Sequence, residues 1–138
     1  NIGIVSLSED EFFVSLGVRS SVEAARNALS DKIQYLTEFL GGEYEIQGAY
    51  PAWEYRKESP LRDKMVEVYE TMYGQKPEVV AIHAGLECGL FYKKIDGLDC
   101  VSLGPDMKDI HTSEEVLDIA STERVWKYLV KVLEELKD

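Results

Sequence analysis

Cysteine is scarce in this chain, which excludes the classes of protein that depend on it. Cys88 and Cys100 lie twelve positions apart, and neither belongs to a CxxC pair. A disulfide framework needs more cysteines and a zinc knuckle needs a second pair, so we interpret both as reduced cytosolic thiols.

Basic residues are also few. Fifteen Lys and Arg stand against 26 Asp and Glu, which gives a net charge of −11. Because such a field repels phosphate backbones, and no Lys/Arg cluster carries interleaved aromatics, we expect no nucleic-acid partner. No apolar run approaches 18 residues, so we expect no membrane span. The first residues lack the pattern of a secretory signal, and we therefore expect a cytoplasmic protein.

What the chain does have is 138 residues, of which 45% are apolar, enough for one ordinary domain or two small lobes. It opens on Asn1 and runs directly into a β-like segment, residues 1–5. This start predicts a piece of a larger protein.

The first part of the chain predicts a small α+β lobe. Residues 11–19 form a second β-like run, in which Phe12, Val14, Leu16 and Val18 alternate with the other face. A strand over 44–50 follows a helix over about 20–40. The order β-β-α-β is typical of part of a ferredoxin-like sandwich.

The helix of this lobe has clear end signals. Ser20 with Glu23 forms a predicted capping box, and Gly41-Gly42 ends the helix. Its apolar residues step by three and four, which predicts one buried stripe. These residues are Val22, Ala25, Leu29, Ile33, Leu36 and Leu40.

The second part predicts the edge of an α/β sheet. Ser59-Pro60 begins a helix that Gly74 ends. Continuous apolar runs at 79–82 and 98–103 predict strands covered on both faces. A last helix starts at about Ser121, and its predicted inward residues are Val125, Leu129, Val132 and Leu136.

Both histidines follow predicted parallel strands, where open α/β sheets place ligands. His111 lies in an acidic loop after Gly104-Pro105, and neutral imidazole is a common zinc ligand. A solvated loop histidine remains the alternative. By spacing alone, the sequence offers at most one good metal ligand.

The other histidine stands in the stretch His83-Ala84-Gly85-Leu86-Glu87-Cys88-Gly89-Leu90-Phe91. Its glycines let backbone amides approach a ligand closely. Glu87 either fixes a polar group or caps a helix. A nucleophilic role for Cys88 is disfavoured, because apolar and acidic neighbours raise the pKa of a thiol.

This stretch, with Ser102-Leu103-Gly104-Pro105 and His111-Thr112 through Glu115, resembles the Xaa-His (aminoacyl-histidine) dipeptidases. These belong to the wider family of two-zinc dipeptidases, aminoacylases and carboxypeptidases. The resemblance covers essentially the whole chain, and residues 18–23 and 50–55 are similar to the family's passages into and out of its lid domain.

The resemblance implies a role for several residues. His111 matches the family's last zinc ligand, and Glu115 falls at an acidic position that supports the loop. Gly85, Leu86 and Glu87 match the loop near the substrate's carboxylate end. His83 has a place near the substrate.

The same resemblance implies an incomplete enzyme. The other ligands of the two zinc ions and the general base lie upstream in the family, so no catalytic residue is expected here and the isolated chain should be inactive. Residues 1–56 would be the latter part of a lid and dimerisation domain. Residues 57–138 would be the C-terminal segment of a phosphorylase/hydrolase-like zinc-peptidase catalytic domain. The implied partners are a small peptide substrate and a second copy bound through the lid-like lobe.

Two other classes stay open from the sequence. One is a stand-alone module that binds a small molecule or pairs with itself without catalysis. The other is a scaffold protein that kept the remains of a peptidase.

Overall fold

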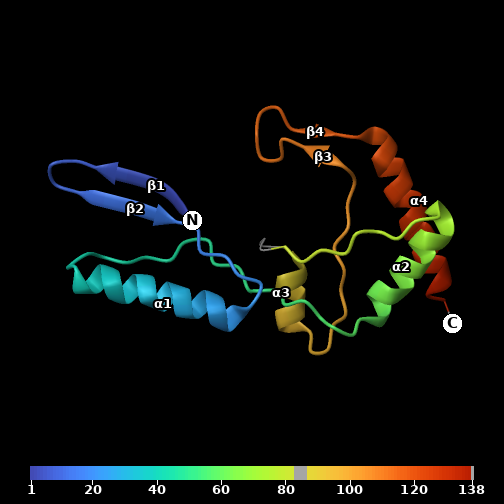
Figure 1. Cartoon of the computed structure of the whole chain (residues 1–138), viewed down its shortest axis with the longest axis horizontal. Helices are drawn as coiled ribbons and strands as arrows, with labels where there is room; N and C mark the ends of the chain where they lie inside the picture. Colours follow the sequence, from blue (N-terminus) through green and yellow to red (C-terminus); the bar gives the residue numbers. More distant parts are fainter. Residues whose placement is uncertain (83–86, 138) are drawn as a thin grey trace. The chain divides into compact units, whose positions relative to one another are not determined.

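The computed structural model of the chain describes residues 1–82 and 87–137, which separate into two compact units. The first unit combines Asn1–Tyr55 with Ala81–Asp96, and the second combines Arg56–Val80 with Gly97–Asp138. Along the chain, a pair of strands is followed by three helices, a second pair of short strands and a last helix (Figure 1). The predicted α/β class is confirmed.

The first unit begins with an antiparallel hairpin of β1 (Ile2–Leu7) and β2 (Phe12–Leu16). Ser8 shapes its turn: the hydroxyl accepts the N–H of Glu11 at 3.0 Å, and the Ser8 N–H donates to the Glu11 carbonyl at 2.8 Å. Both strands were predicted, and the structure confirms them.

One face of this hairpin is apolar and open. Leu7 lies opposite Phe12, and Val5 opposite Val14, so these side chains share a face. Leu7 is 78% exposed and Phe12 is 68% exposed. The alternation therefore marks an apolar face that, in this structure, is not buried.

Helix α1 (Glu23–Phe39) follows, and here one prediction is wrong. Ser20 does not cap the helix, because its hydroxyl accepts the N–H of Val22 at 3.1 Å in a turn that precedes it. Val22 occupies the N-cap position without a side-chain hydrogen bond. The predicted end is confirmed: Gly41 adopts φ 79°, and the Gly42 N–H donates to the Thr37 carbonyl at 2.9 Å.

The stripe predicted for α1 is less buried than expected. No residue of α1 is fully buried, and Leu36 and Leu40 are largely exposed. The small hairpin and the other described segments of the first unit do not cover this stripe.

Three predicted strands, at 44–50, 79–82 and 98–103, are not strands. In the ranges 1–82 and 87–137, strand pairing is confined to two hairpins, β1 with β2 and β3 (Met107–Lys108) with β4 (Val116–Leu117). The second hairpin was not predicted. Apolar and β-branched composition favours an extended backbone, but a strand also needs a neighbour to complete its hydrogen bonds.

The second unit is built on two helices, α2 (Pro60–Tyr73) and α4 (Ile119–Glu135), which pack together (Figure 1). Their buried apolar residues are Met65, Val68, Tyr128 and Val132. The Tyr128 hydroxyl donates to the Met65 carbonyl at 2.7 Å, which satisfies the polar end of a buried ring. Val132 is buried as predicted, whereas Leu136 is exposed.

Both ends of α2 match the prediction. Ser59 caps it by accepting the Arg62 N–H at 3.1 Å, Pro60 opens it, and Gly74 closes it with φ 69°. Within the described ranges, no helix is both long and apolar enough to cross a membrane.

Candidate functional site

His111 lies at the tip of the β3–β4 hairpin of the second unit and is exposed. Its φ of 68° is in the left-handed region, which a residue with a Cβ occupies at a cost of about 1–2 kcal/mol. The His111 N–H donates to the carboxylate of Glu115 at 2.8 Å, and this contact helps to offset the cost. Glu115 thus positions the backbone of the histidine.

Thr112 organises the rest of the loop. Its hydroxyl donates to the Asp109 carbonyl at 2.7 Å and accepts the N–H of Glu114 at 3.1 Å. Because side chains within the loop make these bonds, the loop conformation is encoded locally. His111 therefore lies in a turn whose backbone conformation is fixed by hydrogen bonds within the loop.

The base of this hairpin is anchored to the start of α4. The Asp106 N–H donates to the buried hydroxyl of Ser121 at 2.8 Å, and the Asp118 N–H donates to the Asp106 carbonyl at 3.0 Å. Asp118 also caps α4 by accepting the Ser121 N–H at 2.6 Å. This anchor was not predicted from the sequence, although Asp118 three residues before Ser121 is a recognisable cap signal.

One imidazole alone does not make a metal centre. In the part of the chain that the structure describes, no group of three or more His, Cys, Asp and Glu side chains could hold an ion. Structural and catalytic zinc sites use three or four protein ligands. Among the described residues, His111 therefore has no set of further ligands around it that would complete such a site.

Of the residues predicted near a substrate, His83, Gly85 and Leu86 lie outside the described residues. Glu87 is described: it is exposed and begins α3 (Glu87–Lys94) in the first unit. A carboxylate in the first turn interacts favourably with the helix dipole, so Glu87 has a local structural role there.

Helix α3 is held within its unit by close packing and charge. Gly89 is buried against the Pro51 carbonyl, which would lie 3.0 Å from a Cβ at that position. The Lys93 ammonium pairs with the Glu23 carboxylate of α1 at 3.2 Å. Arg26 of α1 donates to the Tyr50 carbonyl, so α1, α3 and the segment around Pro51 are linked.

No protein-family model matches the chain. Over 136 residues, 99% of its length, the chain is 31% identical to the cytosol non-specific dipeptidase of Escherichia coli (strain K12). The crystal structure of the aminoacylhistidine dipeptidase from Vibrio alginolyticus matches all of it, with a TM-score of 0.77 and 31% identity. The chain is a homologue of these dipeptidases.

The resemblance predicted from the sequence is thereby confirmed. The chain spans 28% of the length of each of the two relatives. Both units share the match, since it covers the whole chain.

Proposed function

We propose that this chain forms the C-terminal portion of a zinc-dependent dipeptidase that hydrolyses small peptides, with aminoacyl-histidine dipeptides as substrates. The supporting observation is that essentially all of this chain is similar to part of two dipeptidases, one of them an aminoacylhistidine dipeptidase. The similar part makes up 28% of the length of each relative. A cytoplasmic location accords with the name of the cytosolic relative.

His111 is the residue of this chain that we propose as a zinc ligand. Zinc, when bound, would supply the chemistry that activates a water molecule toward the peptide carbonyl. His111 would hold one ion, presented by the loop that Glu115 and Thr112 shape. The exposure of His111 supports this, because a ligand shared with other polypeptide must be accessible.

The proposed substrate contacts belong to the segment before and at the start of α3. Gly85, Leu86 and Glu87 would face the carboxylate end of the peptide, with His83 close by. Residues 1–56 would form the latter part of a lid through which two copies pair, and residues 57–138 the end of the catalytic domain. The open apolar face of the β1–β2 hairpin supports the pairing.

The experiment compares two purified proteins in the presence of zinc: the 138-residue chain and the longer polypeptide encoded by its gene. We expect the longer protein to hydrolyse an aminoacyl-histidine dipeptide, to lose this activity with a chelator and to regain it with zinc. We expect the 138-residue chain to be inactive, because His111 is the one zinc ligand proposed in it and the proposed general base lies outside it.

Two outcomes would contradict the proposal. Turnover by the isolated chain would show a different catalytic centre. A coding region without His-x-Asp and Glu-Glu motifs upstream of Asn1 would instead favour the stand-alone binding or self-associating module.

A further inference from the structure

The hydroxyl of Ser121 joins the two ends of the β3–β4 hairpin. It accepts the Asp106 N–H at 2.8 Å, just before β3, and it donates to the Asp118 carbonyl at 2.7 Å, just after β4. The Asp118 N–H donates to the Asp106 carbonyl at 3.0 Å and completes the triangle. Ser121 is only 3% exposed. One buried hydroxyl in the first turn of α4 thus holds both ends of the hairpin.

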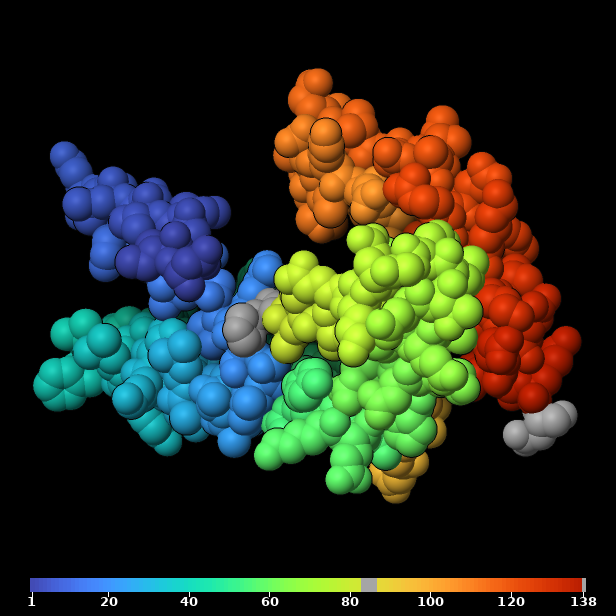
Figure 2. Space-filling model, turned by 45° about the vertical axis from the view of Figure 1, so that its right-hand side comes forward, coloured from blue at the N-terminus to red at the C-terminus, as the bar shows by residue number. Residues whose placement is uncertain are grey.

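The hairpin has no buried side chain of its own, because every residue from 106 to 120 is exposed. It is the orange segment at the top of Figure 2. Its strands have two residues each, and so short a ribbon is not stable by itself. The Arg124 guanidinium lies 3.1 Å from the Asp106 carboxylate, but both side chains are more than half exposed, and such a pair contributes little. The direction of the hairpin therefore depends on the buried hydroxyl.

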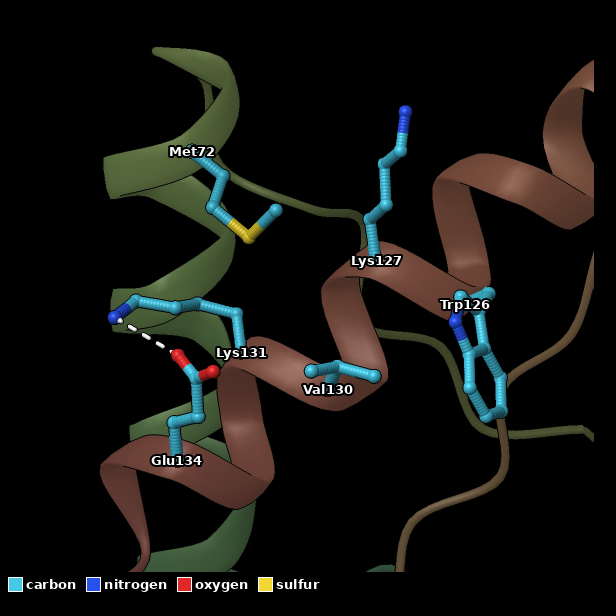
Figure 3. A pocket seen from close by; sticks show the side chains of 6 residues that line it. All are labelled: Met72, Trp126, Lys127, Val130, Lys131 and Glu134. Atoms are coloured by element: carbon cyan, nitrogen blue, oxygen red, sulfur yellow. Dashed lines mark hydrogen bonds and ion pairs between the residues drawn. The ribbon is translucent and has the colours of Figure 1, made fainter.

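Helix α4 is a firm support for this anchor. Tyr128 and Val132 are buried in the core that α4 shares with α2. Met72 of α2 and Val130 of α4 line one shallow groove, with the two helices side by side (Figure 3). Because the helix is held in this way, a loosened anchor frees the hairpin rather than the helix.

The length of the hairpin makes its direction important for His111. His111 lies five positions beyond Asp106, a span of up to about 16 Å at the rise of an extended strand. A tilt of about 5° at the base would therefore move the tip by about 1 Å. The distance between a metal ion and its ligand varies by only about 0.2 Å. A small change of direction at Ser121 is thus large for a ligand at the tip.

We propose that Ser121 is a positioning residue for His111. Its hydroxyl sets the direction in which the hairpin leaves α4, and thereby the place to which the hairpin carries the imidazole. Glu115 and Thr112 shape the tip of the loop, whereas Ser121 directs its base. The part of this role that concerns catalysis rests on the proposed function, in which His111 holds zinc.

A role confined to the start of α4 is the alternative. The Ser121 N–H donates to the capping carboxylate of Asp118 at 2.6 Å, and the bond of its hydroxyl to the Asp118 carbonyl also lies within the helix start. The bond from the Asp106 N–H has no such local purpose, because it joins residues 15 positions apart. Thr122 supplies a matched control, since its hydroxyl donates to the same Asp118 carbonyl at 3.1 Å from an exposed position.

The first measurement uses the 138-residue chain and ¹⁵N relaxation. Ser121→Ala should lower the order parameters of the amides of residues 107–117 from about 0.85 to below about 0.6, with those of α4 beyond its first turn unchanged. Ser121→Thr retains a hydroxyl and should keep the values of the wild type. Thr122→Ala should also leave the hairpin ordered.

A second pair of variants leaves Ser121 in place and serves if Ser121→Ala does not fold. Asp106→Pro removes the N–H that the hydroxyl accepts, at a position just before a strand where proline is tolerated. Asp106→Ala loses the same carboxylate but keeps the N–H. We expect the proline variant alone to show a loosened hairpin.

The second measurement uses the longer polypeptide encoded by the gene and titrates its zinc against a competing chelator. Ser121→Ala should weaken zinc binding by about 10-fold, as loss of a group that orients a ligand does in other sites. Ser121→Thr and Thr122→Ala should bind zinc as the wild type does. A role confined to the helix start would leave the zinc affinity unchanged.

The inference and the proposed function fail separately. A hairpin that stays ordered in Ser121→Ala, or an α4 that loosens together with it, would overturn the inference whatever the activity of the longer polypeptide. Unchanged zinc affinity in a variant with a loosened hairpin would overturn it as well. A wild-type longer polypeptide that binds no zinc would reject the proposed function, while the order parameters would still decide whether Ser121 directs the hairpin.

Discussion

Asp99 stabilises the start of α2 from a distant part of the chain. Its carboxylate accepts the Ser59 hydroxyl at 2.7 Å and the Leu61 N–H at 3.0 Å. Burial alone would raise the pKa of Asp99, but these hydrogen bonds and the guanidinium groups of Arg56 and Arg62 together lower it. The ionised form is therefore the one that the folded chain prefers.

These interactions predict that substitution of Asp99 lowers the stability of the fold by an amount that depends on pH. Asp99→Asn should lower the free energy of unfolding by about 1–2 kcal/mol at neutral pH, because a charged acceptor at a helix start is lost. A lowered folded pKa gives stability that is present above the unfolded pKa and disappears as pH falls through the folded pKa. The difference between wild type and variant should thus shrink in acid, measured by denaturant unfolding from pH 7 to pH 3.

Asp63→Asn is the matched control for Asp99→Asn. Asp63 lies in the first turn of the same helix, but its side chain is 73% exposed and its ion pair with Arg62 is 3.7 Å long. Exposed pairs contribute little. If Asp63→Asn lowered the free energy of unfolding as much as Asp99→Asn, then negative charge near the helix start would explain the loss. The specific hydrogen bonds of Asp99 would not be needed to explain it.

His111 carries the second prediction at the residue scale. If the proposed zinc dipeptidase is correct, His111→Asn in that enzyme should remove one zinc ion and lower kcat/KM by at least about 100-fold, because the proposed metal ligand is lost. Asn is preferred to Ala because the site has φ 68°, which Asn tolerates well. Metal analysis and dipeptide hydrolysis measure the two effects.

Ser113→Ala, in the same exposed loop, is the control for His111→Asn. It should keep both zinc and activity. Full zinc content with normal turnover in His111→Asn would identify the histidine as a solvated loop residue.

At the scale of elements, the close packing of α3 against the segment around Pro51 depends on Gly89. A Cβ there would lie 3.0 Å from the Pro51 carbonyl oxygen and 3.5 Å from the Cβ of Trp53. Gly89→Ala gains up to about 1 kcal/mol in helix propensity but loses about 1–3 kcal/mol to the clash. We expect net destabilisation of the first unit, read from Trp53 fluorescence in a Trp126→Phe background.

Gly104→Ala is the corresponding control, since a Cβ there would meet no atom within 4 Å. It should leave the unfolding transition nearly unchanged. An increase in stability for Gly89→Ala would mean that α3 does not sit against the Pro51 segment as the structure shows.

Elements also differ in how far the sequence predicts them. The ends of α2 depend on Ser59, Pro60 and Gly74, which act within one helical turn, and all were predicted. The segments 44–50, 79–82 and 98–103 have strand-like composition but no ladder in the described residues. The small β3–β4 hairpin depends on its anchor to Ser121, a contact between distant residues that periodicity does not reveal.

At the scale of the whole molecule, the open hairpin predicts self-association. Val5, Leu7 and Phe12 expose a common apolar face, and such patches recruit partner surfaces. The charge of −11 opposes association, but salt screens it beyond about 8 Å at physiological ionic strength. We expect a dimer by sedimentation at micromolar concentration.

A pair of substitutions locates this interface. Phe12→Lys should convert the dimer to a monomer. Ser6→Lys places the same charge on the opposite face, because Ser6 pairs with Phe13, and it should leave the dimer intact. A well-folded monomeric wild type would contradict pairing through the lid-like lobe.

The sequence by itself determined the helices with strong local signals, the hairpin at the start and the dipeptidase resemblance carried by the segments around Glu87 and His111. These depend on hydrogen bonds that close within a few residues and on motifs that are contiguous. The tertiary structure alone decided which extended segments pair, that Tyr128 is buried with Val132, and that α4 is apolar on a second, uncovered side. Those outcomes depend on surfaces formed by residues distant in the sequence. The apolar periodicity of a helix predicts which of its faces is buried but does not identify the surface that covers that face.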